Sequence, residues 1–552
     1  MSRAAVEQIK AASYKVLKED FVSNLTGGSI SEINYVTAVA PVSVLIWSVL
    51  QSRYGFFTPT QRKIKKNAIA TTDDSTTTST VWICTIVEFL INVLSILLAT
   101  TLYASKPVLL NLLLLAPLLI VVYLLPLPKR VAGTLFSKKR NRKKFLLKPT
   151  PDRHRSASGL SSSVNDDKNV DFKALNNPLP KRPFLTTYRG CMLVITCISI
   201  LAVDFHVFPR RFAKVETWGT SLMDVGVGSF VFSTGIVAAR PLLLDQGEAG
   251  SSKTMLRGRL LQAGRNSLPL LLLGLIRLWS VKELDYAEHV SEYGVHWNFF
   301  FTLGFLPPFV TLFQSAFKYL PSYSILALIL GAAYQASLDF TNLKTFILSG
   351  PRNNLLSMNR EGIFSFVGYL AIFLMGQETG LYVLPRRLLP KCFSAWQQRR
   401  RLLLCLGGMS LTWALLFMAT TNRIYGLKIT VSRRLANLPY IIWIAAFNTS
   451  QLTVFCLIET IFFPSVWKLS ENATLLEEEE IYQNATSGVL EAYNRNGLAV
   501  FLLANLLTGV VNLSISTLYC SDLKSMVILV LYAASISGTA VALNWWDISI
   551  KF

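Results

Sequence analysis

The stretch FLTTYRGCMLVITCISILAV, residues 184–203, is a long run in which apolar side chains predominate. A helix needs about 20 mainly apolar residues to cross the ~30 Å hydrocarbon core of a bilayer, and this stretch has that length. Hydrophobic residues make up 52% of the 552-residue chain and charged residues only 16%, which excludes a soluble protein of this length. The sequence therefore predicts an all-α polytopic membrane protein.

Similar apolar windows recur from Ile33 to the end of the chain and predict about thirteen transmembrane helices. An odd number of crossings places the two termini on opposite sides of the membrane. The windows are 33–51, 80–103, 107–126, 184–203, 220–243, 267–281, 297–316, 322–338, 361–384, 402–420, 437–463, 496–516 and 525–545.

Lys and Arg residues are concentrated in short runs between these windows. The net charge of +22 would suggest nucleic acid as the partner of a soluble protein, but cytosolic loops of membrane proteins carry such an excess. A luminal N-terminus and a cytosolic C-terminus make every run cytosolic, so we expect that topology, the lipid bilayer as partner and no nucleic acid. The runs comprise Arg62, Lys63, Lys65 and Lys66; residues 138–144; Arg257 and Arg259; and Arg386, Arg387, Lys391 and Arg399 to Arg401.

Composition divides the chain into three regions. Residues 1–126 contain a luminal tail and the first three spans, and residues 127–183 are basic and polar, which predicts a partly disordered cytosolic loop. Residues 184–552 form the main transmembrane bundle, with a candidate catalytic loop at 204–220. The seven cysteines show no CxxC pair, so neither disulfides nor a metal site is indicated. The sequon at Asn24 is expected to be luminal, whereas those at Asn472 and Asn484 are expected to be cytosolic and unmodified.

Charged residues crowd into VDFHVFPRRFAKVETWGTSLMDVGVGSF, residues 203–230, between the fourth and fifth windows. Asp204 directly follows the apolar run, at a depth where an ionised carboxylate needs a partner or a water-filled cavity. Lys214, Arg210 and Arg211 are close enough in sequence to be that partner, although the two arginines are equally well explained as interfacial anchors. A carboxylate beside a lysine can accept a proton while the ammonium stabilises developing negative charge. This arrangement suits attack by an alcohol on an acyl carbonyl.

Asp224 is a second acidic residue, early in the fifth window. A carboxylate inside a span is by default part of a functional site or of a polar network. Small residues at helical spacing follow it and favour close approach of helix backbones: Gly226, Gly228, Ser229, Ser233 and Gly235.

EYGVHWNFFFTLGFLP, residues 292–307, places His296 and Asn298 at the luminal start of the seventh window. A histidine near an asparagine can serve as general base and hydrogen-bond donor. Residues two apart nevertheless point about 200° apart on a helix, so a structural role for one of them stays open.

AYNRNGLAVFLLANLLTGVVNLS, residues 492–514, carries polar side chains at the cytosolic end of the twelfth window and inside it. Arg495, beside Asn496, is placed to meet a phosphate of a nucleotide-bearing donor. Asn505, Thr508 and Asn512 either bond neighbouring helices or line a polar cavity.

These residues alone leave three classes of protein open: an enzyme, a transporter or lipid scramblase, and a non-catalytic scaffold. A transporter would depend on movement or gradients rather than on a thioester, and a scaffold would lose assembly or abundance when Asp204 is substituted. The chain has no phosphate-binding loop, zinc-protease motif or serine-hydrolase motif, so those enzyme classes lack support.

Three stretches together, at 203–233, 292–303 and 494–514, resemble the inositol acyltransferases of glycosylphosphatidylinositol (GPI) anchor synthesis. The fungal branch of that family is called GPI-anchored wall transfer protein, and the resemblance covers most of the chain. It implies a thirteen-span enzyme of the endoplasmic reticulum with a luminal N-terminus. Such an enzyme moves a fatty acyl chain, typically palmitoyl, from acyl-CoA to the inositol ring of glucosaminyl-phosphatidylinositol.

The resemblance also implies that Asp204 and Lys214 are the catalytic pair. Asp204 would be the general base on the inositol 2-hydroxyl, and Lys214 would orient Asp204 and stabilise the oxyanion. Acyl-CoA would be a co-substrate, with no permanently bound cofactor. The residues alone also allow the reverse division, or a base role for His296. The expected substrate-binding residues are Arg210, Arg211, Asp224, His296, Asn298, Arg495, Asn496 and Asn505.

Overall fold

Each of the thirteen windows coincides with a helix in the computed structural model of the chain. The structure describes residues 14, 16–57, 74–124, 179–247, 256–283, 290–313, 322–386, 388, 393–468 and 475–550. Within this part of the chain the regular secondary structure is helical, apart from one isolated bridge between Gly27 and Thr220. The predicted all-α polytopic fold is therefore confirmed.

Ten spans in the described part of the chain are long and apolar enough to cross a membrane. The first is formed by α2 (Ile30–Thr37) and α3 (Val39–Tyr54), and the second by α5 (Asp74–Phe89), a π-helical turn (Leu90–Leu94) and α6 (Ser95–Thr100). The others are α10 (Pro183–Ala202), α11 (Leu222–Gly247), α15 (Tyr323–Phe340), α18 (Arg360–Val383), α19 (Ala395–Thr421), α20 (Leu438–Phe462), α23 (Gly497–Ser514) and α24 (Asp522–Trp545).

The remaining three windows contain α7 (Pro107–Leu124), α12 (Leu256–Glu283) and α14 (Phe299–Phe313). The apolar parts of α7 and α14 are shorter. Helix α12 begins well before the predicted residue 267, because its first turns are polar and hydrophobicity alone does not show where a helix of good helix-forming residues starts. Short helices lie between the spans: α13 (Val290–Tyr293), α16 (Leu343–Ser349), α17 (Leu355–Met358), α21 (Leu475–Asn484) and α22 (Gly488–Arg495).

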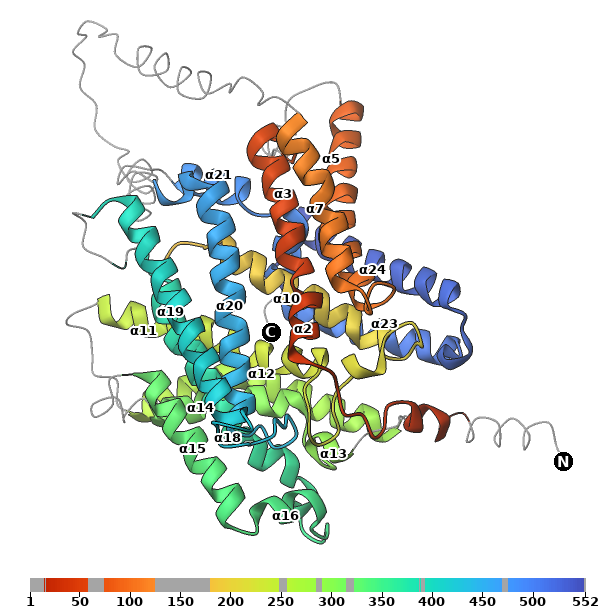
Figure 1. Ribbon diagram of the computed structural model, residues 1–552, viewed down its shortest axis with the longest axis vertical. Helices are drawn as coiled ribbons and strands as arrows, with labels where there is room; N and C mark the ends of the chain where they lie inside the picture. Colours follow the sequence, from red (N-terminus) through yellow and green to blue (C-terminus); the bar gives the residue numbers. More distant parts are fainter. Residues whose placement is uncertain are drawn as a thin grey trace, which may run out of the picture.

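The connections between helices gather on two faces. The chain before α2 and the loops after α10, α12, α15 and α19 form one of them, which we call the N-terminal face (lower part of Figure 1). Its contacts include Gly28 N to Thr220 O (2.8 Å), Gly219 N to Val431 O (2.9 Å) and His296 N to Asn359 Oδ1 (2.7 Å). The opposite face is joined by Arg386 with Glu478 (2.7 Å) and Lys181 with Glu479 (3.2 Å). Helices that cross in alternating directions produce this grouping.

Several sequence predictions fall outside the described residues. They include the basic runs at 62–66 and 138–144, most of the polar loop at 127–183, Arg387, Lys391 and the sequon at Asn472. The other two sequons lie on different faces, because exposed Asn24 belongs to the chain before α2 and Asn484 ends α21.

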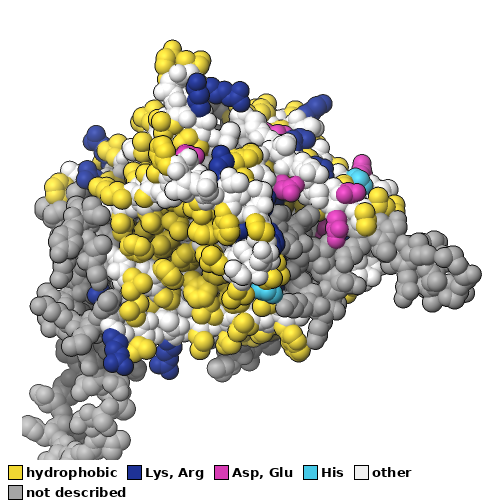
Figure 2. Space-filling model, turned by 90° about the horizontal axis from the view of Figure 1, so that it is seen from below, with side chains coloured by type: hydrophobic (Ala, Val, Ile, Leu, Met, Phe, Trp, Pro, Cys, Tyr) yellow, Lys and Arg dark blue, Asp and Glu magenta, His cyan; other side chains and the backbone are white. Residues whose placement is uncertain are grey.

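Large apolar side chains remain exposed on the outward surfaces of the spans. On α19, Leu404, Leu411, Leu415 and Met418 are between 58% and 62% exposed. Figure 2, seen from below Figure 1, also shows hydrophobic side chains over a broad area. A soluble protein rarely exposes so large an apolar area, and the exposed side of α19 is suited to contact with lipid.

Helices α11 and α18 approach each other closely through glycines. A Cβ atom on Gly235 would collide with the carbonyl oxygen of Phe373, and one on Gly376 would collide with that of Phe232. The small-residue run after Asp224 therefore packs helices together as predicted, at Gly235 against α18 and at Gly228 against the side chain of Ile444.

Replacing Gly376 with Ala is expected to destabilise the protein by about 1–3 kcal/mol, because the new methyl group must push α11 and α18 apart. Gly407→Ala is the matched control, since nothing lies within 4 Å of a Cβ on Gly407 and alanine favours helix over glycine. Thermal melting in detergent should show a loss only for Gly376→Ala, and equal melting temperatures would contradict this packing.

Three buried carboxylates inside the spans hold the first turns of neighbouring helices. The first N–H groups of a helix lack partners within that helix, and the positive end of its dipole favours a negative charge. Glu88, Glu378 and Glu459 accordingly serve the fold on the opposite face. They accept from Val489 N of α22 (2.9 Å), Tyr323 N of α15 (2.9 Å) and Phe184 N of α10 (2.8 Å).

Candidate functional site

The loop after α10, residues 203–221, is anchored to the N-terminal face by aromatic side chains. Phe205, Phe208 and Phe212 have no exposed surface, and the rings of Phe208 and Phe212 are 5.9 Å apart. The loop contains a single 3-10 turn at Arg210–Phe212. Burial of the three rings fixes the loop, so its polar side chains have defined positions.

Asp204 is 7% exposed and has two polar partners. Its Oδ1 lies 3.6 Å from Lys18 Nζ, and its Oδ2 accepts a hydrogen bond from Asn512 Nδ2 (2.8 Å). Lys18 Nζ also donates to Asn512 Oδ1 (2.9 Å), so the three side chains form a closed cluster. The prediction that Lys214, Arg210 or Arg211 pairs with Asp204 is wrong, because the ion-pair partner is Lys18.

Lys214 pairs with Glu292 of α13 instead, with Nζ 2.7 Å from Oε1. The same carboxylate oxygen lies 3.3 Å from Nη2 of Arg433. Burial alone would raise the pKa of Glu292, but the positive charges of Lys214 and Arg433 lower it to about 2. Glu292 is therefore ionised at neutral pH and fixes the ammonium of Lys214, whose side chain is 36% exposed.

Arg433 continues this network to Asp224, with Nε 2.6 Å from Oδ1 and both side chains no more than 2% exposed. Asp224 Oδ2 also accepts from Val215 N (3.3 Å), which ties the loop to α11. Lys214, Glu292, Arg433 and Asp224 thus form a chain of alternating charges. Asp224 therefore belongs to a polar network, which is one of the two roles predicted for it.

Sequence reasoning missed Glu292, Arg433 and Lys18. One signal was available for Arg433. With Arg434 it forms a basic pair in a loop that the predicted topology assigns to the lumen, where the charge bias leaves few basic residues.

The side chains of the two arginines in the loop hold neighbouring segments of the protein together. The Arg210 guanidinium lies 3.8 Å from the ring centre of Phe21 and donates to the carbonyl of Phe208 (2.9 Å). Burial lowers the pKa of Arg210 to about 10, while the charge of Asp204 opposes that shift. Arg211 pairs with Glu32 of α2 (2.8 Å). Both arginines therefore have partners within the protein other than Asp204.

Asn298 is engaged in holding α14 against α12. Its Oδ1 accepts from Phe300 N (3.0 Å) and Phe301 N (3.2 Å), and its Nδ2 donates to Gly274 O (2.9 Å). His296 is fixed through its backbone, which donates to Asn359 Oδ1 (2.7 Å). The structure gives Asn298 an architectural role, and its amide is not paired with His296.

The predicted residues around α23 separate into two groups. Arg495 pairs with Asp547 (2.8 Å), and Asn496 Nδ2 donates to the carbonyl of Ile548 (3.0 Å), so both fasten the end of α24 on the opposite face. Asn505 bonds within its own helix, to Phe501 O (2.8 Å). Only Asn512, near the far end of α23, reaches Asp204.

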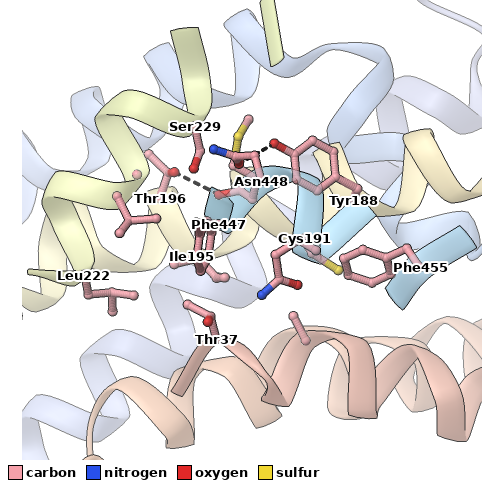
Figure 3. Close-up of a pocket in the computed structure, with 15 residues that line it drawn as sticks. Thr37, Tyr188, Cys191, Ile195, Thr196, Leu222, Ser229, Phe447, Asn448 and Phe455 are labelled. Carbon is pink, nitrogen blue, oxygen red and sulfur yellow. Dashed lines mark hydrogen bonds between the residues drawn. The ribbon is translucent and has the colours of Figure 1, made fainter. Parts of the chain in front are cut away.

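A mainly apolar pocket with a cavity volume of about 40 Å³ lies between α2, α3, α10, α11 and α20. Leu222, Val225 and Gly226 line it, which brings it to the turn of α11 that carries Asp224. Figure 3 shows Thr196, Ser229 and Asn448 on one side and Thr37 on the other. Tyr188 donates to Asn448 Oδ1 (2.6 Å). A cavity of this volume has room for a few water molecules.

Fold and site define a multi-pass α-helical membrane protein with clusters of buried charge at one face. The chain belongs to the GWT1 family, whose model matches residues 14–543. It is 53% identical to GPI-anchored wall transfer protein 1 of Gibberella zeae over 545 residues, which cover 98% of this chain and 99% of the relative. The protein of the same name from Aspergillus fumigatus is 51% identical over 540 residues (97% and 99%). That from Saccharomyces cerevisiae is 38% identical over 557 residues (98% and 100%).

Proposed function

We propose that this protein is an acyltransferase of GPI-anchor biosynthesis in the endoplasmic reticulum membrane. It transfers a palmitoyl chain from acyl-CoA to the inositol 2-hydroxyl of glucosaminyl-phosphatidylinositol. Membership of the GWT1 family supports the pathway. The observation that carries the chemistry is Asp204, a nearly buried carboxylate held from both oxygens at one membrane face.

In the proposed reaction Asp204 accepts the proton of the inositol hydroxyl, whose oxygen attacks the thioester carbonyl carbon. The C–O bond forms, the C–S bond breaks and the coenzyme A thiolate leaves, so a strong general acid is not required. Lys214 stabilises the negative oxygen of the tetrahedral intermediate. Its contact with Glu292 supports this role because a fixed, partly exposed ammonium is accessible to a substrate without having to reorganise.

The test uses purified full-length protein in detergent, labelled palmitoyl-CoA and glucosaminyl-phosphatidylinositol. Mass spectrometry should find one palmitoyl group on the inositol ring, with release of free coenzyme A. Free palmitate in place of the thioester is the control and should give no product. A folded protein that makes no product, yet moves lipids between the leaflets of proteoliposomes, would contradict the enzyme and favour the scramblase.

A further inference from the structure

The chain before α2, residues 16–28, lies along the loop that carries Asp204, and we call it the N-terminal strap. Gly28 N donates to Thr220 O (2.8 Å), Thr220 Oγ1 donates to Gly28 O (2.8 Å), and Glu216 N donates to Leu25 O (3.1 Å). The two segments therefore pair where residues 25–28 of the strap meet residues 216–220 of the loop.

Glycine is required on both sides of this pairing. Gly27 has a φ of +80° and Gly219 a φ of +135°, conformations that residues with a Cβ rarely adopt. A Cβ on Gly27 would also collide with Thr220 O, and one on Gly219 with Thr26 O. The close fit shows that the strap is built into the site and is not a loose tail.

Aromatic contacts fix the strap on either side of Lys18. Just before the strap, the rings of Tyr14 and Tyr519 are 5.7 Å apart. Within it, Phe21 packs under the guanidinium of Arg210 and against the ring of His206 (4.6 Å). Lys18 itself is 21% exposed. Holding a long side chain in one geometry costs rotamer entropy. The aromatic contacts on either side of Lys18 fix the backbone that carries it and so reduce the freedom that remains to be lost.

We propose that Lys18 and Asn512 are positioning residues for Asp204, a proposal that rests on the proposed function. Each carboxylate oxygen has its own partner: Lys18 lies beside Oδ1, and Asn512 donates to Oδ2. The amide oxygen of Asn512 accepts from Lys18 (2.9 Å), so each partner holds the other. Together they fix the rotation of the carboxylate and compensate its charge. Lys18 and Asn512 thus take the orienting role that the family resemblance implied for Lys214.

If Lys18 served only to attach the strap to the rest of the protein, the prediction would differ. Its loss would then lower the melting temperature and the yield, while the turnover per folded molecule would stay unchanged. Loss of a positioning contact lowers kcat, because displacement of a catalytic group by about 1 Å costs on the order of 100-fold, while KM for each substrate changes little.

The experiment measures kcat and KM for palmitoyl transfer by Lys18→Ala, Lys18→Arg and Asn512→Ala, with melting temperatures for each. Asp20→Ala is the matched control, because Asp20 is an exposed charged residue of the same strap. We expect kcat to fall on the order of 100-fold for Lys18→Ala and Asn512→Ala, with KM within about twofold and the control unchanged. Lys18→Arg should recover most of the loss, since it restores the positive charge. If Lys18→Ala does not fold, Lys18→Gln replaces it.

Unchanged kcat in folded Lys18 and Asn512 variants would overturn this proposal. As long as the wild type transfers palmitate, the proposed function would not be affected by that result. A folded wild type without transfer would overturn both proposals. Equal loss in Lys18→Ala and Lys18→Arg, without rescue by charge, would likewise overturn the role given to the ammonium.

Discussion

Replacing Asp204 with Asn is expected to lower kcat for palmitoyl transfer by about 10²–10⁴-fold, the usual contribution of a general base. An amide cannot take the proton of the inositol hydroxyl, although it has nearly the same shape as the carboxylate. Lys214→Ala is expected to lower kcat by about 10²–10³-fold through loss of oxyanion stabilisation. The measurement is single-turnover transfer by purified variants with checked melting temperatures.

Asp522→Asn is the control for this series, because Asp522 is an exposed aspartate at the start of α24 on the same face. Its transfer rate should equal that of the wild type. Full activity in folded Asp204→Asn would contradict the assignment of Asp204 as the general base. His296 would then be the next residue to substitute.

Asp224→Ala is expected to destabilise the protein by about 3–5 kcal/mol, the largest loss of stability predicted here. The substitution removes the carboxylate 2.6 Å from Arg433, whose side chain is only 2% exposed. The guanidinium keeps Glu292, 3.3 Å away, but loses its closest partner, and breaking a buried ion pair from one side carries that cost. Thermal melting in detergent, with the yield of monodisperse protein, measures the effect.

The matched control is Asp547→Ala, which breaks the ion pair with Arg495 at the opposite face. Asp547 is 72% exposed, and exposed pairs contribute roughly 0–1 kcal/mol. Similar melting temperatures for the two variants would show that the Asp224 network contributes little to the fold. Partial recovery in a double variant that replaces Asp224 and Arg433 by apolar residues would support the buried-charge explanation.

The sequence predicted the fold well because one physical requirement dominates it. A span must be apolar over about 20 residues, and that signal is local, so all thirteen windows carry helices. The start of α12 was missed, since its first turns contain Arg257, Arg259 and Arg265 and lack the apolar signal. The intramembrane glutamates that hold helix ends were not recognised, because their partners belong to other helices.

The site was predicted only in part. Asp204 and Asp224 were recognised because a carboxylate next to or inside an apolar run is costly unless it is paired. Their partners were not, because Asn512 is 308 residues from Asp204 and Arg433 is 209 residues from Asp224. Lys214 is only ten residues from Asp204, but nearness in sequence does not decide ion pairing across a loop that contains a 3-10 turn.

The cluster of Lys18, Asp204 and Asn512 also orders events during synthesis. Lys18 and Asn512 are 494 residues apart, and ribosomes add about 5–20 residues per second, so roughly 25–100 s separate the emergence of the two side chains. During that time Asp204 has neither its amide partner nor a complete surface on which the strap can dock. A chain arrested before α23 would lack this cluster, so under the proposed function acyl transfer would report that insertion has been completed almost to the last helix.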